Sequence, residues 1–134
     1  MSFLRKLLGG EEPLTGGSAS RRQKTYSAES GYVFQYVFEG FRETSRSGGR
    51  GYEYVFNVSP NRREWFPVSV FLPRTVLEAW SAGHHELTAS ERFAIGKIAL
   101  RRAFDAHDNP ADLRQGVVLN RADMDAIVEF LTLE

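Results

Sequence analysis

The side chains best suited to acid–base chemistry or metal binding near neutral pH are the three histidines His84, His85 and His107. His84 and His85 are neighbours in a predicted turn, where adjacent side chains point apart, and His107 follows them by the length of a helix. The sequence holds neither a histidine pair at helical i, i+4 spacing nor a His-x-His pair on a strand. Residues 105–112 lack the central glycine and final glutamate of a calcium-binding EF-hand loop. We therefore expect no metal site and no cofactor.

The motifs of nucleophilic and phosphate chemistry are missing from the sequence as well. The chain has no cysteine for a thiol nucleophile, and no Gly-x-Ser-x-Gly motif places a serine on a nucleophile turn. The glycine-rich run from Ser47 to Gly51 precedes a predicted strand rather than a helix, and it lacks the lysine and hydroxyl residue of a P-loop. We therefore predict no catalytic residues, infer no small-molecule substrate, and expect that the chain is not an enzyme.

The composition limits the class of protein further. With 134 residues, of which 42% are hydrophobic, the chain is long enough for one domain with a substantial core and too short for two. Its 17 basic and 17 acidic side chains cancel, unlike the strongly basic balance typical of nucleic-acid-binding domains. No apolar run reaches the roughly 20 residues needed to span a bilayer, and the lack of cysteine excludes a disulfide scaffold.

The elements that must position any site begin with strands. Apolar and polar residues alternate over residues 32–39, 52–59 and 65–72, and the alternating apolar positions of the first two are mostly aromatic. The glycines and charged residues of 42–51 predict a long hairpin loop between these two stretches. Pro67 cannot donate a ladder hydrogen bond, so the third stretch is expected at a sheet edge or at a bulge. We predict a three-stranded antiparallel meander with one aromatic face.

Helices are predicted after the strands. Residues 74–82 favour a short helix, and Thr88 with Glu91 forms a capping-box pattern that opens a longer helix ending near residue 106. Residues 117–119 favour a short strand, and Asn120 suits the N-cap of a last helix. The expected fold class is therefore α+β, with two to three helices after the meander in the order β-β-β-α-α-(β)-α. Residues 31–134 would form a single domain.

The residues before this domain follow a different pattern. Residues 9–30 are rich in glycine and serine and poor in large apolar side chains, which is typical of a flexible linker. Residues 1–8 predict a short amphipathic helix with Arg5 and Lys6 opposite an apolar face. The residues of that face are Phe3, Leu4, Leu7 and Leu8. So short a helix is unstable alone in water, and we expect it to order only against a second surface.

These patterns favour a non-catalytic accessory or adaptor protein that docks to a protein partner or a multi-subunit assembly. The tethered helix would supply a second, partner-binding anchor, because linking two weak contacts raises the overall affinity. The same apolar face could instead lie on a membrane, which makes peripheral membrane contact an alternative. Residues 1–8 are too short for a secretory signal, so we expect a cytoplasmic location, with the inner face of a membrane as the alternative.

Single-stranded nucleic-acid binding is the second function class that the sequence suggests. Arg42, Arg46 and Arg50 lie in the predicted loop beside the aromatic strands, and such residues can bind phosphates while the rings stack on bases. The aromatic face is also the better core face, however, because the opposite face carries polar residues such as Gln35 and Glu53. A nucleic-acid-binding module built on these three arginines and the sheet aromatics is therefore the alternative function.

Overall fold

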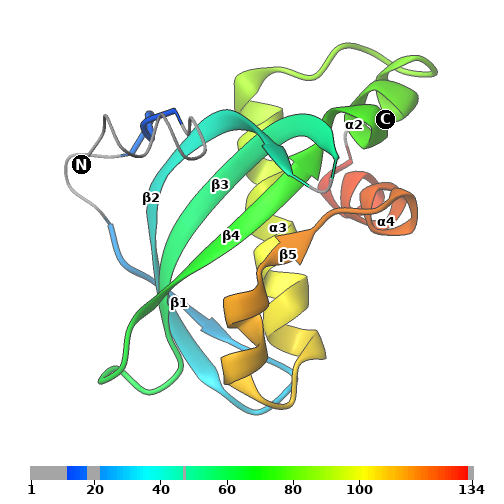
Figure 1. Cartoon of the computed structure of the whole chain (residues 1–134). Helices are drawn as coiled ribbons and strands as arrows, with labels where there is room; N and C mark the ends of the chain where they lie inside the picture. Colours follow the sequence, from blue (N-terminus) through cyan, green and yellow to red (C-terminus); the bar gives the residue numbers. More distant parts are fainter. Residues whose placement is uncertain (1–11, 18–21, 47, 133–134) are drawn as a thin grey trace.

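The computed structural model of the chain describes residues 12–17, 22–46 and 48–132. The elements in chain order are β1 (Lys24–Ser27), β2 (Val33–Arg46), β3 (Gly49–Ser59), β4 (Phe66–Pro73), α2 (Arg74–Ser81), α3 (Ala89–Ala106), the 3-10 helix η1 (Pro110–Gln115), β5 (Val117–Val118) and α4 (Arg121–Leu131). A curled sheet is covered on one face by α3, and α4 lies beside α3 (Figure 1). The predicted α+β class is confirmed.

Within the described residues the sheet has five strands in the spatial order β1-β2-β3-β4-β5, so the predicted three-stranded sheet is too small. β1 to β4 are antiparallel neighbours, and β2, β3 and β4 form the predicted meander. The short strand predicted near residue 117 is β5, which runs parallel to β4 and pairs with Val70 and Phe71. Pro67 of β4 pairs with β3, but β5 does not reach it, so among the described residues it has a neighbouring strand on one side only. This edge position suits proline, which has no N–H to donate to a second strand.

The strand that the sequence did not predict is β1, which lies inside residues 9–30 and so within the expected linker. Its four residues pair with Val33–Tyr36 of β2. Tyr26 Oη donates to Asp105 Oδ2 at 2.9 Å, and Ser30 Oγ donates to the carbonyl oxygen of Phe104 at 2.8 Å. These contacts hold a polar stretch against the end of α3. The amphipathic helix predicted for residues 1–8 lies outside the described residues.

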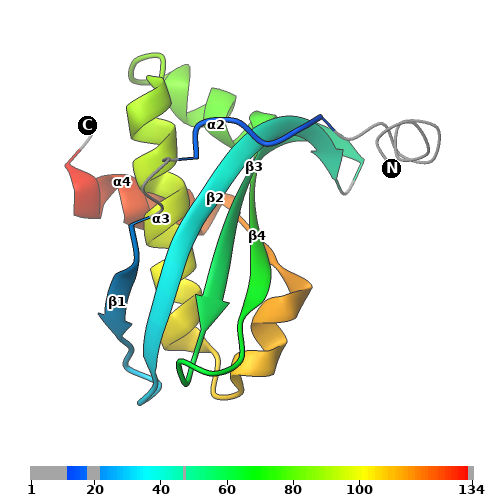
Figure 2. The same ribbon diagram turned by 90° about the vertical axis from the view of Figure 1, so that its left-hand side faces the viewer.

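The hairpin of β2 and β3 has a shorter connection than the sequence predicted. β2 continues to Arg46 and β3 begins at Gly49, so most of the expected loop is strand. A bulge interrupts the pairing between Phe38 and Gly40. Gly40 has φ of 134°, and a Cβ there would lie 2.9 Å from the carbonyl oxygen of Thr15. Bulges increase local bending, and the hairpin end of β2 and β3 curls away from α3 (Figure 2).

The aromatic face of the sheet forms the core against α3, as its alternation predicted. Each of five rings of this core is at most 2% exposed, namely Phe34, Tyr36, Tyr54, Phe56 and Phe104. The rings of Phe34 and Phe104 stack with their centroids 4.0 Å apart. Leu77 and Trp80 of α2 are also buried in the core. The helices that frame the sites below are therefore fixed to the sheet by apolar packing.

Side-chain caps set the starts of α3 and α4. Thr88 Oγ1 accepts from the Glu91 N–H at 3.1 Å, and Glu91 Oε1 accepts from the Thr88 N–H at 2.9 Å. Asn120 Oδ1 accepts from the Asp123 N–H at 2.8 Å. Both predicted N-caps are confirmed, because each supplies an acceptor to backbone donors that a helix leaves unpaired in its first turn.

Candidate functional sites

The two adjacent histidines have local partners at the turn after α2. His84 Nδ1 lies 2.9 Å from the carbonyl oxygen of Trp80, and its ring stacks on the Trp80 ring at a centroid distance of 4.3 Å. His85 Nε2 lies 3.2 Å from Glu91 Oε2. The N–H of Thr88 and the nearby His85 lower the pKa of the Glu91 carboxyl, which is therefore a cap and not a proton donor at neutral pH.

The third histidine, His107, lines a hollow of about 310 Å³ between α3, β5 and α4. Asp123 lines the same hollow, but no hydrogen bond joins the two side chains. Asp123 Oδ1 instead lies 3.5 Å from an Nη of Arg102. In the part of the chain that the structure describes, no three His, Asp or Glu side chains converge to hold a metal ion. The hollow thus contains an ion pair rather than a paired acid and base.

The most connected polar cluster lies on the outer face of the sheet, opposite α3, and we call it the Glu53 cluster. It comprises Arg42, Arg46, Glu53 and Ser69. Glu53 Oε1 accepts from Arg42 Nε at 2.6 Å and from an Nη of Arg46 at 3.1 Å, while Oε2 accepts from Ser69 Oγ at 2.5 Å. The Glu53 side chain is only 4% exposed.

The electrostatics of the Glu53 cluster favour the ionised carboxylate. Burial raises the pKa of Glu53, but the hydrogen bonds from Ser69 and Arg42 and the positive charges of Arg42 and Arg46 outweigh it, so the net shift is downward. A carboxylate held ionised with donors on both oxygens is a poor general acid. The cluster therefore serves to join strands β2, β3 and β4 on their outer face.

The three arginines predicted for nucleic-acid contact do not share one surface. Arg42 and Arg46 point to Glu53 on the outer face. Arg50 lies on the opposite face of the hairpin, where an Nη is 3.8 Å from Glu43. The aromatic rings expected to stack on bases are packed under α3. The structure thus places Arg50 on the opposite face from Arg42 and Arg46, and it buries the rings of Tyr36, Tyr54 and Phe56.

A groove that the sequence did not single out lies between α3 and α4. Its volume is about 220 Å³, and its lining residues include Tyr26, Ile98, Arg102, Ala126, Ile127 and Phe130. Phe130 is 70% exposed, the largest exposure of any large hydrophobic residue among those described. The sequence carried a signal for it, since Met124, Ile127 and Leu131 form the apolar stripe of α4 and Phe130 falls at its margin.

The groove continues into the hollow beside His107, because both are lined by Arg102 and Ile127. On the far side of that hollow, Val118 of β5 is 53% exposed. We call the whole area the α4 surface, defined by Ile98, Arg102, Val118, Ala126 and Phe130. The predicted partner-binding residues Phe3, Leu4, Leu7 and Leu8 lie outside the described residues, so their position relative to this surface is not part of the structure.

Comparison with known proteins found no matching family model, no matching curated protein and no matching solved structure. Across the described ranges, no helix is long and apolar enough to cross a membrane.

Proposed function

We propose that this chain is a non-catalytic accessory or adaptor domain that binds a protein partner through the α4 surface. The observation that carries the proposal is the Phe130 side chain, which stands 70% exposed at the edge of an apolar groove. Aromatic side chains at the centre of an interface supply a large share of binding energy, because they bury much apolar area with few rotatable bonds.

The surroundings of Phe130 match the anatomy of a protein interface. Ala126 is partly exposed beside the groove on α4, and the buried side chains of Ile127 and Ile98 form its floor. Charged side chains form the margin, where Arg102 and Asp123 pair at 3.5 Å and are both partly exposed. Interfaces commonly combine an apolar centre with a polar margin of this kind, and the margin selects partners of complementary charge.

Three residues elsewhere that could do chemistry favour a binding role over a catalytic one. Glu91 caps α3, and Glu53 is held by two arginines and a serine. His84 is stacked on Trp80 at a helix end. A general base must have a free lone pair within reach of substrate, and these groups already have partners that fix the fold.

The N-terminal helix predicted for residues 1–8 is a second anchor in this proposal. Its support is the amphipathic pattern of Phe3, Leu4, Leu7 and Leu8. A weak second contact on a tether raises the effective concentration of the first without a larger interface. Deletion of residues 1–8 is therefore expected to weaken partner binding, and substitution at the α4 surface to abolish most of it.

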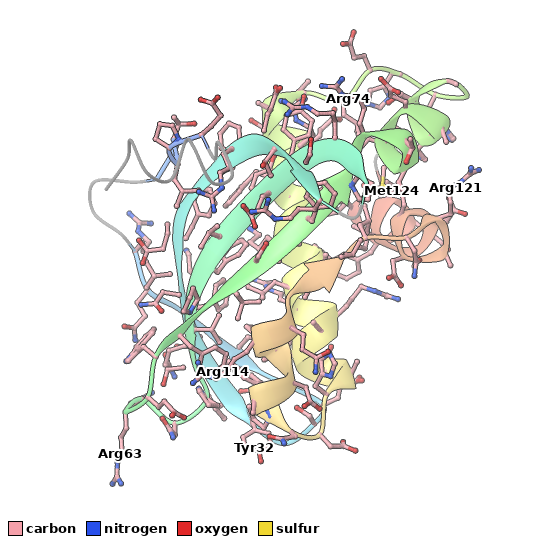
Figure 3. All side chains as sticks on the ribbon, in the orientation of Figure 1. Tyr32, Arg63, Arg74, Arg114, Arg121 and Met124 are labelled. Carbon is pink, nitrogen blue, oxygen red and sulfur yellow. The ribbon has the colours of Figure 1, made fainter. Side chains whose placement is uncertain are left out.

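The test compares Phe130→Ser with Tyr32→Ser in the full chain. Tyr32 is a matched control, because it is also an exposed aromatic residue, at 39%, and lies at the end of the molecule away from α4 (Figure 3). Partners crosslinked to the wild-type chain in its host would be purified and their affinity measured directly by calorimetry. We expect Phe130→Ser to lower the affinity by about tenfold or more, and Tyr32→Ser to leave it unchanged.

The proposal would be wrong if a purified partner bound Phe130→Ser as tightly as it binds the wild-type chain. Both variants alter exposed side chains, so their melting temperatures should stay close to that of the parent protein, and circular dichroism checks this. Loss of binding by both variants would place the contact elsewhere and would also contradict the α4 surface.

The single-stranded nucleic-acid alternative has less support from the geometry. Arg42 and Arg46 neutralise Glu53, and Arg50 sits near Glu43, so each arginine has an acidic neighbour within the hairpin. Base stacking needs exposed rings, whereas Tyr54 and Phe56 are buried under α3. A fluorescence-anisotropy titration with single-stranded DNA and RNA at low salt tests this alternative directly.

A further inference from the structure

A second hollow, between β2 and α3, carries an inference that is independent of the α4 surface. We infer that it binds a small organic anion with an apolar body, of which an aromatic carboxylate is the simplest example. The hollow has a volume of about 170 Å³. Its lining residues are Arg22, Lys24, Tyr36, Phe38, Phe56, Phe93 and Lys97.

Among the described residues, the outer edge of β2 is paired at two places with an interval between them. β1 pairs with β2 as far as Tyr36 and no further. The next pairing on that edge, within the ranges the structure describes, is the bridge between Thr15 and Phe41. Phe38 lies between these two pairings, opposite the Phe93 turn of α3. The hollow therefore lies along this interval of β2, between the described residues of β1 and those of α3.

The floor of the hollow is a set of aromatic rings that pack on one another. The Phe38 centroid lies 5.3 Å from that of Phe56 and 4.7 Å from that of Phe93. Tyr36 and Phe56 are almost fully buried, and their rings meet edge to face at 6.1 Å. Because these rings belong to the core, the apolar half of the site exists before any ligand arrives.

The rim of the hollow is cationic. Lys24 is the first residue of β1, Arg22 precedes that strand by two residues, and Lys97 belongs to α3. One helical turn beyond Lys97, Arg101 donates from Nη2 to Tyr36 Oη at 2.9 Å and from Nε at 3.1 Å. Arg101 itself lines the groove between α3 and α4, and among the described residues none of the three cations that line this hollow, Arg22, Lys24 and Lys97, is paired with a carboxylate. The site thus gathers positive charge that the protein itself leaves uncompensated there.

Two further features suit an anion that carries a ring or a short acyl chain. The Tyr36 hydroxyl accepts from Arg101, so its own hydrogen is left to donate, and no described residue accepts it. Burial and the like charges of Arg101 and Lys24 lower the pKa of the Lys97 ammonium, which an anion in the hollow would offset. Ligand pockets for larger molecules span roughly 300–1,000 Å³, so this hollow admits only a small body.

The first experiment is a heteronuclear NMR titration of the full chain with benzoate, benzyl alcohol and acetate. Benzoate combines the ring and the charge, benzyl alcohol keeps the ring without the charge, and acetate keeps the charge without the ring. We expect benzoate to shift the amide signals of Phe38, Phe93 and Lys97, and to bind at least about tenfold more tightly than either comparison compound. Equal affinity for benzyl alcohol, or no saturable shift with benzoate, would overturn the inference.

The second experiment assigns the charge. Lys97→Met keeps most of the side-chain stem and removes the ammonium, and we expect it to weaken benzoate binding about tenfold. Arg63→Met is the matched control, because Arg63 projects from the turn between β3 and β4 (Figure 3) and should leave the affinity unchanged. If Lys97→Met proves unstable, Lys24→Met tests the same rim from an exposed residue. Unchanged affinity in the folded rim variant overturns the inference.

Two further arms distinguish this site from the other proposals. Phe130→Ser should bind benzoate like the wild-type chain, because Phe130 belongs to the α4 surface and not to this hollow. A short oligothymidylate should not displace benzoate. Displacement would assign the cationic rim to nucleic acid and would count against a small-anion site.

Discussion

The two faces of the sheet bury their side chains by different means. The face toward α3 buries aromatic rings, of which Phe34 and Phe104 stack with their centroids 4.0 Å apart. The outer face buries polar groups as well, since Gln35 and Glu53 are 1% and 3% exposed. Apolar rings gain from any burial, whereas a buried charge is stable only with its partners in place. The inner face should therefore depend on packed volume, and the outer face on a matched set of charges.

The curl of the sheet explains why polar side chains are buried on the outer face at all. The hairpin end of β2 and β3 bends away from α3, so the outer side is the concave one there (Figure 2). Side chains on a concave face converge, and this brings Arg42, Arg46 and Ser69 onto Glu53. The inner face remains packed against α3, with which it forms the hydrophobic core.

The largest expected effect comes from removing a ring on the inner face. Phe104→Ala deletes a side chain with no exposed surface that packs against Phe34 and Tyr36. We expect a loss of about 3–5 kcal/mol in the free energy of unfolding, because the lost transfer energy adds to the cost of the cavity. Urea unfolding followed by circular dichroism measures it. A loss below about 1 kcal/mol would mean that the inner face is not the dominant core.

Local pattern predicted the inner face well, because each of its elements carries its own signal. The alternation over 32–39 and 52–59 identified β2 and β3, and the capping box of Thr88 identified the start of α3. β1 carried no such signal, since only Tyr26 of its four residues is a large apolar one. What holds β1 is pairing with β2 and the bond from Tyr26 to Asp105, 79 residues away.

The sites were harder to predict than the strands, for the same reason. Treating residues 42–51 as a loop left Arg42 free to bind phosphate, whereas the register of the hairpin places it opposite Glu53. The hollow between β2 and α3 takes Arg22, Phe56 and Lys97 from three separate segments. Composition and periodicity describe one segment at a time, so they cannot show a site that only the assembled sheet creates.

An intermediate effect is expected from neutralising the carboxylate on the outer face. Glu53→Gln leaves two arginines facing a neutral amide. We expect the free energy of unfolding to fall by about 2 kcal/mol at neutral pH. The folded-state pKa of Glu53 lies below its usual value of 4.5. Its stabilisation is therefore present above that value and is lost as pH falls through the folded-state pKa. The difference in the free energy of unfolding between wild type and Glu53→Gln should therefore decrease over that acid range. Unfolding measured at a series of pH values tests this.

Glu43→Gln is the control for this pH profile. Glu43 lies on the same hairpin but is 49% exposed, with its nearest arginine nitrogens at 3.8 and 3.9 Å. Exposed pairs of this kind contribute little, so the substitution should change stability by less than about 0.5 kcal/mol. If Glu53→Gln showed as small an effect as Glu43→Gln, the Glu53 cluster would not be what holds the outer face together.

The smallest effects on stability are expected for two arginines of the hairpin, one on each face of the sheet. Arg42 is 14% exposed and lies 2.6 Å from Glu53, whereas Arg50 is 53% exposed and lies 3.8 Å from Glu43. Arg42→Ala removes one of two arginines from a buried carboxylate that keeps Arg46, so we expect a loss of about 1–2 kcal/mol. Arg50→Ala should stay within about 0.5 kcal/mol of the parent, because water replaces its partner without cost.

Added salt should widen this contrast between the arginines. Screening weakens interactions of exposed charges far more than those of buried ones, so the small effect of Arg50→Ala should vanish at about 0.5–1 M salt. The effect of Arg42→Ala should persist there, because Glu53 stays away from solvent and loses its donor at 2.6 Å, Arg42 Nε, in this variant. Equal effects for the two variants at high salt would show that the outer face is held by the strand pairing itself, with the buried charges merely tolerated.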